Sequence, residues 1–265
     1  MRNQSKRTFL AGFMGQLGLE EELLERPGTS VLGLDDRADT NIVAVYWAGA
    51  RTFLWADPAV VERIGGLASE KMAAGSNDVA EHMIGAGFGE VAKATMRVLA
   101  DGASGELEPA PLAERYRHGV LSADDPAHVG LVRAFAERND RDDVEEAALD
   151  EIDEPDGFQE TAINVVTPQA GQPGITDDMV AYASAAPWDW DPTFGDIGVL
   201  VEPDHRDHGL GRFVVAHTCL QLLTADLVPL YRHGGHNKGS AQLSVGLGFE
   251  PATELTVYQL TSNDD

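Results

Sequence analysis

The chain has 265 residues, and its 44 acidic side chains outnumber its 19 basic ones to give a net charge of −25. This length allows one or two domains, and the charge disfavours binding to nucleic acid or to an anionic membrane surface. The apolar runs fall short of the ~18 residues that a membrane span needs. The single cysteine, Cys219, excludes an internal disulfide. We therefore expect a cytoplasmic protein.

Residues 1–110 are expected to form a smaller α/β domain of unknown role. After an amphipathic start, the segments NIVAVYW and RTFLWA flank a tight AGA turn and predict a β-hairpin. Helices are expected over residues 58–74 and 88–100. The Gly/Pro-rich stretch DGASGELEPAP then predicts a linker, which places the domain boundary between residues 110 and 111.

One sequence pattern occurs in both parts of the chain. FLWADPAVVERIGGLASE resembles VLSADDPAHVGLVRAFAER, and each is a strand-like run that leads into Asp-Pro-Ala and a helix. Shared helix-start chemistry explains such a match, because proline suits the first turn of a helix. A degenerate partial repeat is the alternative, and both interpretations remain open.

Residues 111–265 show a regular alternation of elements. A strand at 115–121 precedes a helix at 125–139 and a very acidic helix at 140–156. Strands are expected in FQETAINVVTP, MVAYASA and, after the turn-rich PWDWDPTF, in GDIGVLVEP. A helix after HRDHGLGR, a strand VPLYRHG, a helix NKGSAQLSVGLG and a strand TELTVYQL complete the order. This order predicts an α/β (α+β) domain with a mixed sheet and helices on its faces.

The segment GVLVEPDHRDHGLGR is typical of an anion-binding loop. It joins a strand to a helix through Gly209 and Gly211, which let the backbone approach a ligand closely. The N–H groups of the helix's first turn and its macrodipole favour a negative charge there. Residues 142–205 contain no lysine or arginine, and only four basic residues follow Arg141: Arg206, Arg212, Arg232 and Lys238. This distribution predicts a ligand with several negative charges, such as a diphosphate.

Two motifs in this part of the chain resemble those of the GNAT superfamily of N-acetyltransferases. The run VEPDHRDHGLG at residues 201–211 resembles the acetyl-CoA diphosphate loop of that family. The segment HNKGSAQLSVGLGFEP at residues 236–251 resembles the later motif that closes the cofactor site. The resemblance covers residues 112–262, and it implies a mostly antiparallel sheet with a splayed central strand.

The resemblance also implies a cofactor site for acetyl-CoA as cosubstrate, with no metal. Backbone groups of Leu200 and Val201 would contact the pantetheine arm, Asn237 and Ser240 would contact the cofactor beside the later helix, and Arg232 or Lys238 could meet the 3′-phosphate. The loop that holds the diphosphate would comprise Arg206, Asp207, His208, Gly209, Leu210, Gly211 and Arg212.

The catalytic residues implied by the resemblance are less complete. Many family members carry a tyrosine seven residues after the asparagine as the acid that protonates the departing thiolate, and here that position is Ser244. Ser244 or a water could serve, or Tyr231 could reach in from the neighbouring strand. Asp196 is the first candidate for the base and Glu202 the second. A strand N–H near Val201 would stabilise the carbonyl oxygen.

These patterns together favour an N-acetyltransferase that acts on a primary amine of a small molecule or peptide by direct attack. The ten acids between residues 140 and 156 favour a cationic amine, and Trp188 and Trp190 could wall its site. A non-catalytic acyl-CoA-binding or sensing protein is the alternative. A metal-dependent hydrolase is a third hypothesis, built on the pairs His205/His208 and His233/His236. Nucleic acid and membranes are not expected as partners, and a homodimer is left open.

Overall fold

The computed structural model describes residues 4–35, 38–64, 77–149, 162–169, 178–188 and 191–261. The chain divides into two compact units. Unit 1 comprises Met1–Lys6, Arg97–Arg232 and Gly239–Glu250, and unit 2 comprises Arg7–Met96, His233–Lys238 and Pro251–Asp265. This division falls elsewhere than the expected boundary at residues 110 and 111. The expected linker contains the 3-10 helix η4 (Ala103–Leu107), whose end residues lie buried in the core of unit 1.

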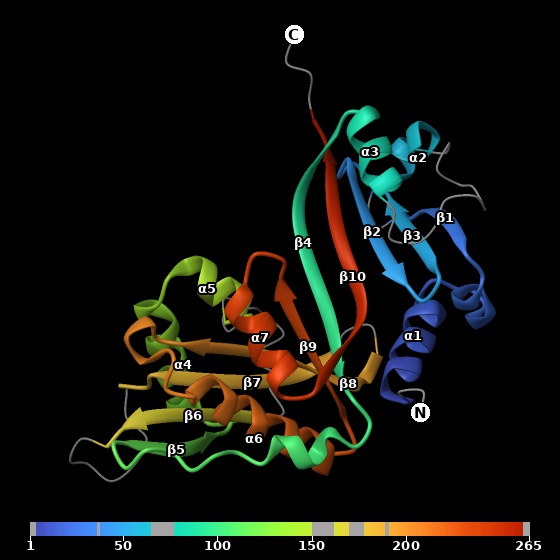
Figure 1. The fold of residues 1–265 in the computed structure, drawn as a ribbon. Coiled ribbons are helices and arrows are strands. Elements are labelled where there is room, and N and C mark those ends of the chain that lie inside the picture. Colours follow the sequence, from blue (N-terminus) through green and yellow to red (C-terminus); the bar gives the residue numbers. More distant parts are fainter. Residues whose placement is uncertain are drawn as a thin grey trace. The chain divides into compact units, whose positions relative to one another are not determined.

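Unit 1 is built on five strands in the spatial order β9-β8-β7-β6-β5 (Figure 1). The strands are β5 (Tyr116–Leu121), β6 (Ala162–Pro168), β7 (Ala181–Trp188), β8 (Asp191–Val201) and β9 (Val228–Gly234). Neighbours from β5 to β8 run antiparallel, whereas β8 and β9 are parallel. The helices are α4 (Pro126–Arg138), α5 (Arg141–Glu146), η6 (Pro203–His205), α6 (Leu210–Thr224) and α7 (Lys238–Gly246). The expected element order is therefore confirmed.

The central strand β8 separates from β9 part of the way along its length. Paired residues run from Phe194/Val228 to Ile197/Tyr231, and the described pairing of these two strands ends there. Residues 198–201 of β8 remain paired with β7 alone among the described strands. This geometry confirms the mostly antiparallel sheet with a splayed central strand, and it leaves one side of β8 open.

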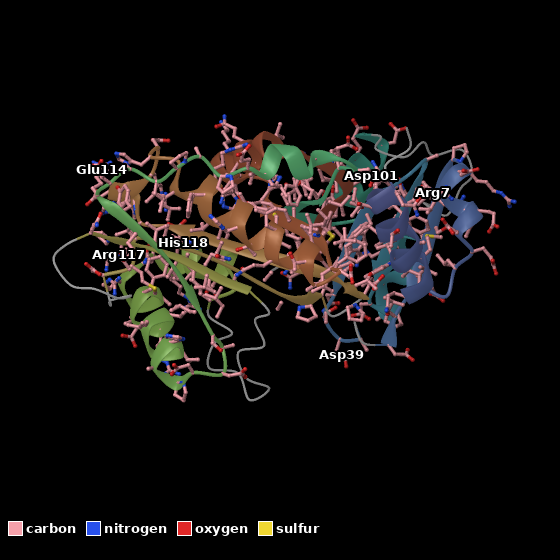
Figure 2. All side chains as sticks on the ribbon, turned by 90° about the horizontal axis from the view of Figure 1, so that it is seen from below. Arg7, Asp39, Asp101, Glu114, Arg117 and His118 are labelled. Carbon is pink, nitrogen blue, oxygen red and sulfur yellow. The ribbon has the colours of Figure 1, made fainter. Side chains whose placement is uncertain are left out.

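A polar network fixes α6 against the sheet. The side-chain amide of Asn164 on β6 is buried and donates to Thr218 Oγ1 at 2.9 Å and to Gln221 Oε1 at 2.6 Å. Its oxygen lies 3.0 Å from His118 Nε2 on β5, and the His118 ring stacks on His217 of α6 at 4.4 Å. Figure 2 shows His118 on the edge strand beneath this helix. Because every group of the buried amide is used, the network specifies one position for α6.

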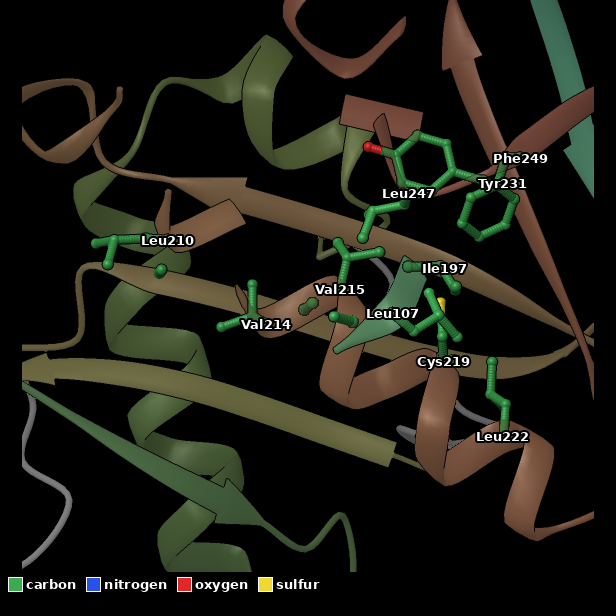
Figure 3. Packing of buried hydrophobic residues seen from close by; sticks show 14 of the residues in the cluster. Leu107, Ile197, Leu210, Val214, Val215, Cys219, Leu222, Tyr231, Leu247 and Phe249 are labelled. Atoms are coloured by element: carbon green, nitrogen blue, oxygen red, sulfur yellow. The ribbon is translucent and has the colours of Figure 1, made fainter. Parts of the chain in front are cut away.

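Apolar packing covers both faces of the unit 1 sheet. Buried residues of α6, including Val214, Val215 and Cys219, pack on the same face as Ile197 of β8 (Figure 3). The opposite face carries α4 and α5, whose buried side chains pack around Leu200. The two layers hold β8 in the middle, so the helix that follows it begins at a fixed place relative to the open side of the strand.

Unit 2 is built on five strands in the spatial order β1-β3-β2-β10-β4. Its strands are β1 (Gly28–Gly33), β2 (Ile42–Ala48), β3 (Arg51–Ala56), β4 (Phe88–Leu99) and β10 (Phe249–Leu260), and its helical segments are α1 (Gln4–Gln16), η1 (Glu21–Glu25), α2 (Pro58–Ile64) and α3 (Asn77–Gly85). The expected hairpin is confirmed as β2 and β3, and its turn contains Gly49 in a left-handed conformation (φ 63°).

Two expectations about individual elements are corrected. The helix expected over 88–100 is the strand β4, because pairing with β10 outweighs the helix-forming composition of FGEVAKATMRVL. The acidic helix expected over 140–156 ends at Glu146, and Ala148 turns left-handed at φ 53°. The segment PWDWDPTF spans the end of β7 and the start of β8, and residues 189–190 between them lie outside the described part of the chain. Residues 65–74 and 150–156 lie outside the described part of the chain.

The repeated Asp-Pro-Ala sequence performs the same task in both units. Asp125 Oδ1 accepts a hydrogen bond from Ala127 N at 2.9 Å, and Asp57 Oδ1 accepts one from Ala59 N, also at 2.9 Å. In each case the aspartate caps a helix whose first residue is proline. Helix-start chemistry therefore accounts for the Asp-Pro-Ala part of the repeated sequence.

Candidate functional site

The loop after β8 ends in an uncapped helix N-terminus. Gly209 is the N-cap of α6 with φ 75°, and no side chain accepts a hydrogen bond from the helix there. The first intrahelical bond runs from Phe213 N to Gly209 O at 3.0 Å, so the preceding N–H groups have no helical acceptor. Residues 206–209 are exposed. The positive end of this 15-residue helix thus faces solvent, as an anion site requires.

Arg206 shapes the loop through two contacts inside unit 1. Its Nε donates to Val201 O at 3.0 Å, and its Nη2 lies 2.6 Å from Asp143 Oδ2 on α5. The guanidinium therefore joins the end of β8, the loop and the acidic helix. Asp207, which follows it, takes the left-handed conformation with φ 62°. Direct contact between Arg206 and a diphosphate stays a prediction.

The other expected cations also make defined contacts. Arg212 Nη1 donates to Gly246 O, which ties α6 to the end of α7. Arg232 Nε donates to Asp196 Oδ2 at 2.7 Å. Lys238 and Asn237 belong to unit 2. Arg206, Arg212 and Arg232 all belong to unit 1, and each has its own structural partner.

The open side of β8 presents alternate backbone groups. Glu202 N donates to Val180 O at 3.0 Å, and the β7–β8 ladder continues from there without a shift as far as Pro187. Because hydrogen bonds alternate along an antiparallel pair, the backbone groups of Val199 and Val201 point away from β7, and those of Leu200 point toward it. Val199 and Val201 are therefore better placed than Leu200 to bind a ligand through the backbone.

The candidate bases are both paired with arginines. Asp196, at 15% side-chain exposure, forms an ion pair with Arg232, so an incoming amine would compete with a guanidinium for it. Glu202 Oε1 lies 3.5 Å from Arg138 Nη2 on α4. Either carboxylate is held in place, and the role of each as a base stays a prediction.

Both candidate acids are buried, and Tyr231 is the one on a strand beside β8. It lies at the last residue pair of the β8–β9 ladder, where the strands separate. Its hydroxyl is 2.8 Å from Ser240 Oγ on α7, and burial raises the pKa of Tyr231 to about 12, so the hydroxyl keeps its proton at neutral pH. Ser244 is buried and donates to Ala241 O at 2.9 Å within its own helix. That hydroxyl proton is already used.

The remaining candidates have packing partners. Burial raises the pKa of the Cys219 thiol, which keeps it protonated in the core of unit 1. Trp188 is nearly buried and packs edge-on against Phe194 at 6.3 Å, while Trp190 lies outside the described residues. In the described part of the chain, no three His, Cys, Asp or Glu side chains are grouped as metal ligands would be.

The sequence interpretation missed a cluster beside the loop. Tyr116, at the start of β5, places its hydroxyl 2.9 Å from His205 Nδ1, and its ring lies 6.5 Å from that of His208. The Arg115 guanidinium lies over the Tyr116 ring at 4.9 Å. These residues are separated from the loop by some ninety positions in sequence, so no local motif connects them.

Comparison with known proteins found similarity among solved structures. No protein-family model and no curated protein matches the sequence. Solved structures do match: a tandem GNAT protein from the clavulanic acid biosynthesis pathway has a TM-score of 0.52 at 15% identity, over 73% of this chain and 62% of that one. A GCN5-related N-acetyltransferase from Kribbella flavida matches at a TM-score of 0.46 and 16% identity, over 69% of this chain and 64% of that one. A GCN5-related N-acetyltransferase from Sphaerobacter thermophilus matches at a TM-score of 0.49 and 12% identity, over 78% of this chain and 71% of that one.

The chain therefore has the fold of the GNAT superfamily of acetyltransferases, as the sequence motifs predicted. The matched part spans less than two thirds of the tandem protein and of the Kribbella protein. No helix among the described residues is long and apolar enough to cross a membrane.

Proposed function

We propose that the protein is an N-acetyltransferase that moves an acetyl group from acetyl-CoA to a primary amine of a small molecule or peptide. One observation carries the proposal: the strand that separates from its neighbour at Ile197/Tyr231 continues directly into an uncapped helix N-terminus. The open side of the strand offers backbone hydrogen-bonding groups, and the helix start that follows it is suited to an anion. Together they fit a ligand that joins a pantetheine arm to a diphosphate.

The pantetheine arm would lie along the open side of β8. Val199 and Val201 would supply backbone groups to its amides, in place of the Leu200 groups expected from sequence. The diphosphate would then reach the first-turn N–H groups of α6, including those of Leu210 and Gly211. Arg206 would hold this loop in shape from the side.

The reaction would be direct attack of the neutral amine on the thioester carbonyl carbon. The C–N bond forms as the carbonyl oxygen gains charge, which a β8 N–H stabilises. The C–S bond then breaks, and Tyr231 gives the departing thiolate its proton, with Ser240 as the neighbouring hydroxyl. The amine's proton would pass to Asp196, Glu202 or water. Holding the two reactants together accounts for most of the expected acceleration.

We propose a cationic amine as the acceptor class. A Cβ on Gly198 would clash with Ala147 O, which shows how closely the end of α5 approaches the open part of β8. The helix carries Asp142, Asp143, Glu145 and Glu146. Acidic side chains beside the thioester would concentrate cationic amines there.

A transfer assay with matched amines tests the proposal. With acetyl-CoA, we expect turnover of diamines or amino sugars and slower turnover of neutral amines of equal size. The Tyr231→Phe variant should lose about 100-fold in kcat at unchanged acetyl-CoA affinity, because only the proton donor is removed. Ser244→Ala is the matched hydroxyl deletion, and less than tenfold loss is expected. A larger loss in Ser244→Ala than in Tyr231→Phe would reverse the assignment of the acid.

The second candidate is an acyl-CoA-binding protein without turnover. The buried, internally bonded hydroxyl of Ser244, at the position of the family's usual tyrosine, favours it. Binding of acetyl-CoA with no transfer to any amine of the screen would support this candidate against the enzyme.

A further inference from the structure

Arg115 is a fixed arginine without an acidic partner. It is exposed just before β5, and its guanidinium lies over the ring of Tyr116 at 4.9 Å. Among the described residues, none of the ion pairs involves Arg115, and Figure 2 labels its neighbour in sequence, Glu114, at the periphery of the molecule. In a chain with 44 acids and 19 basic residues, a guanidinium held against a ring and left unpaired is suited to an anion from outside.

The Arg115 cluster, which we define as Arg115, Tyr116, His205 and His208, adjoins the α6 loop. Tyr116 is 93% buried, and its hydroxyl lies 2.9 Å from His205 Nδ1. His208 Nδ1 lies 3.3 Å from the carbonyl oxygen of His205, and it directly precedes Gly209, the N-cap of α6. One connected set of contacts therefore runs from the arginine to the open helix end.

The hydrogen bonds of the cluster fix where some of its ring protons lie. A carbonyl oxygen only accepts, so His208 Nδ1 carries a proton. If the Tyr116 hydroxyl donates to His205 Nδ1, the proton of that neutral ring is on Nε2. The Arg115 guanidinium and the two imidazoles lie around the Tyr116 ring, at 4.9, 5.8 and 6.5 Å from its centre.

Other arginines of unit 1 differ from Arg115 in this respect. Arg138, Arg141, Arg206 and Arg232 each lie within 4 Å of a carboxylate, as the ion pairs with Glu202, Glu145, Asp143 and Asp196 show. Among the described residues, the one side-chain contact of Arg115 is with an aromatic ring, which leaves its N–H donors for a ligand.

We propose that the Arg115 cluster is a second anion subsite that binds a phosphate monoester, and that it receives the 3′-phosphate of coenzyme A. The second half of this statement rests on the proposed function. Arg232, the residue expected there from sequence, is held by Asp196. A subsite beside the diphosphate loop would let the protein distinguish coenzyme A from its analogue without the 3′-phosphate.

Calorimetric titration with coenzyme A and with 3′-dephospho-coenzyme A tests this proposal. The intact protein should bind coenzyme A about tenfold more tightly than the analogue, as one charge-assisted contact provides. Arg115→Ala should bind both at the affinity of the analogue, and Arg115→Lys should recover part of the difference. Arg133→Ala removes the same charge from the exposed surface of α4, on the other face of the sheet, and should keep the full difference.

The outcomes separate this inference from the proposed function. Equal preference for coenzyme A in the intact protein and in Arg115→Ala would overturn the subsite and leave the cofactor assignment standing. If neither compound binds the intact protein, the cofactor assignment fails. Titration with adenosine 3′,5′-bisphosphate then tests the subsite by itself. Its binding to the intact protein and not to Arg115→Ala would support the subsite alone, and no binding would overturn both. Thermal unfolding of each variant excludes loss of fold as the cause.

Discussion

Two helices of unit 1 begin in opposite ways. Helix α4 follows Asp125, whose carboxylate accepts a hydrogen bond from Ala127 N, and proline occupies its first position. Helix α6 follows Gly209, which has no side chain and a left-handed backbone. A carboxylate cap accepts a hydrogen bond from the free N–H groups at the helix start and occupies the place where an anion would bind. The comparison shows that this acidic chain leaves uncapped the helix end that our proposal assigns to the diphosphate.

Closing the open end should have the largest effect. Gly209→Asp places a carboxylate where the diphosphate is expected, and nothing lies within 4 Å of the new Cβ to prevent it. We expect acetyl-CoA affinity to fall on the order of 100-fold through like-charge repulsion. Gly209→Asn has the same shape and the same cost at positive φ, and it should lose less than about fivefold. Equal losses measured by calorimetry would show that shape, not charge, decides binding.

Removing the cap from the closed end should act on stability alone. Asp125→Ala is expected to lower the free energy of unfolding by about 1 kcal/mol, as N-cap truncations do. Asp125→Asn keeps an acceptor oxygen and should lose only a few tenths. Acetyl-CoA affinity should stay unchanged in both variants. Chemical denaturation checks the stability, and a change in affinity above about threefold would mean that the two helix ends are coupled.

A capped end in unit 2 should give a smaller, pH-dependent effect. Hydrogen bonds from Asn41 N and Ala59 N lower the pKa of Asp57 below its ordinary value. A carboxyl whose pKa is lower in the folded state stabilises it above the unfolded pKa of about 3.9 and loses this effect as the pH falls through the folded pKa. The difference in melting temperature between the intact protein and Asp57→Asn should therefore be constant near neutrality and shrink below about pH 4. A difference that persists unchanged to pH 3 would contradict this account.

The stacked pair of His118 and His217 should add a further dependence on acidity. Burial, together with the neighbouring His118, lowers the pKa of His217. The folded state then resists protonation of this ring, so stability should fall as the pH drops from about 6.5 through the folded pKa. His217→Phe keeps a ring against Phe213 and should weaken this dependence, which unfolding at pH 5 and 8 can measure.

The fold of unit 1 was predictable because its signals are local. Asp125-Pro126 marks a helix start and Gly209-x-Gly211 marks a turn, and each is read within a few residues. The strand β4 was not predictable, because its composition favours a helix and its partner β10 lies about 150 residues away. Side-chain partners were also not predictable, because they lie far apart in sequence: Asp143 and Arg206 are 63 positions apart.

The anion site shows the same division between local and distant information. The glycine spacing predicted the turn into a helix at Gly209 and Gly211, where the structure has the exposed start of α6. The sequence did not indicate that Arg206 and Arg232 would be engaged by carboxylates, nor that Arg115 would have no carboxylate partner within the described ranges of the chain. The number of cations near the motif indicated the region of the proposed anion site. It did not show which of these cations are available to a ligand.

The central claim is that the open start of α6 and the open side of β8 bind acetyl-CoA. Calorimetric titration of the intact protein with acetyl-CoA, with Gly209→Asp beside it, tests this most directly. The account predicts micromolar binding by the intact protein and a loss on the order of 100-fold in the variant. Absence of binding by the intact protein, or equal binding by both, would contradict it.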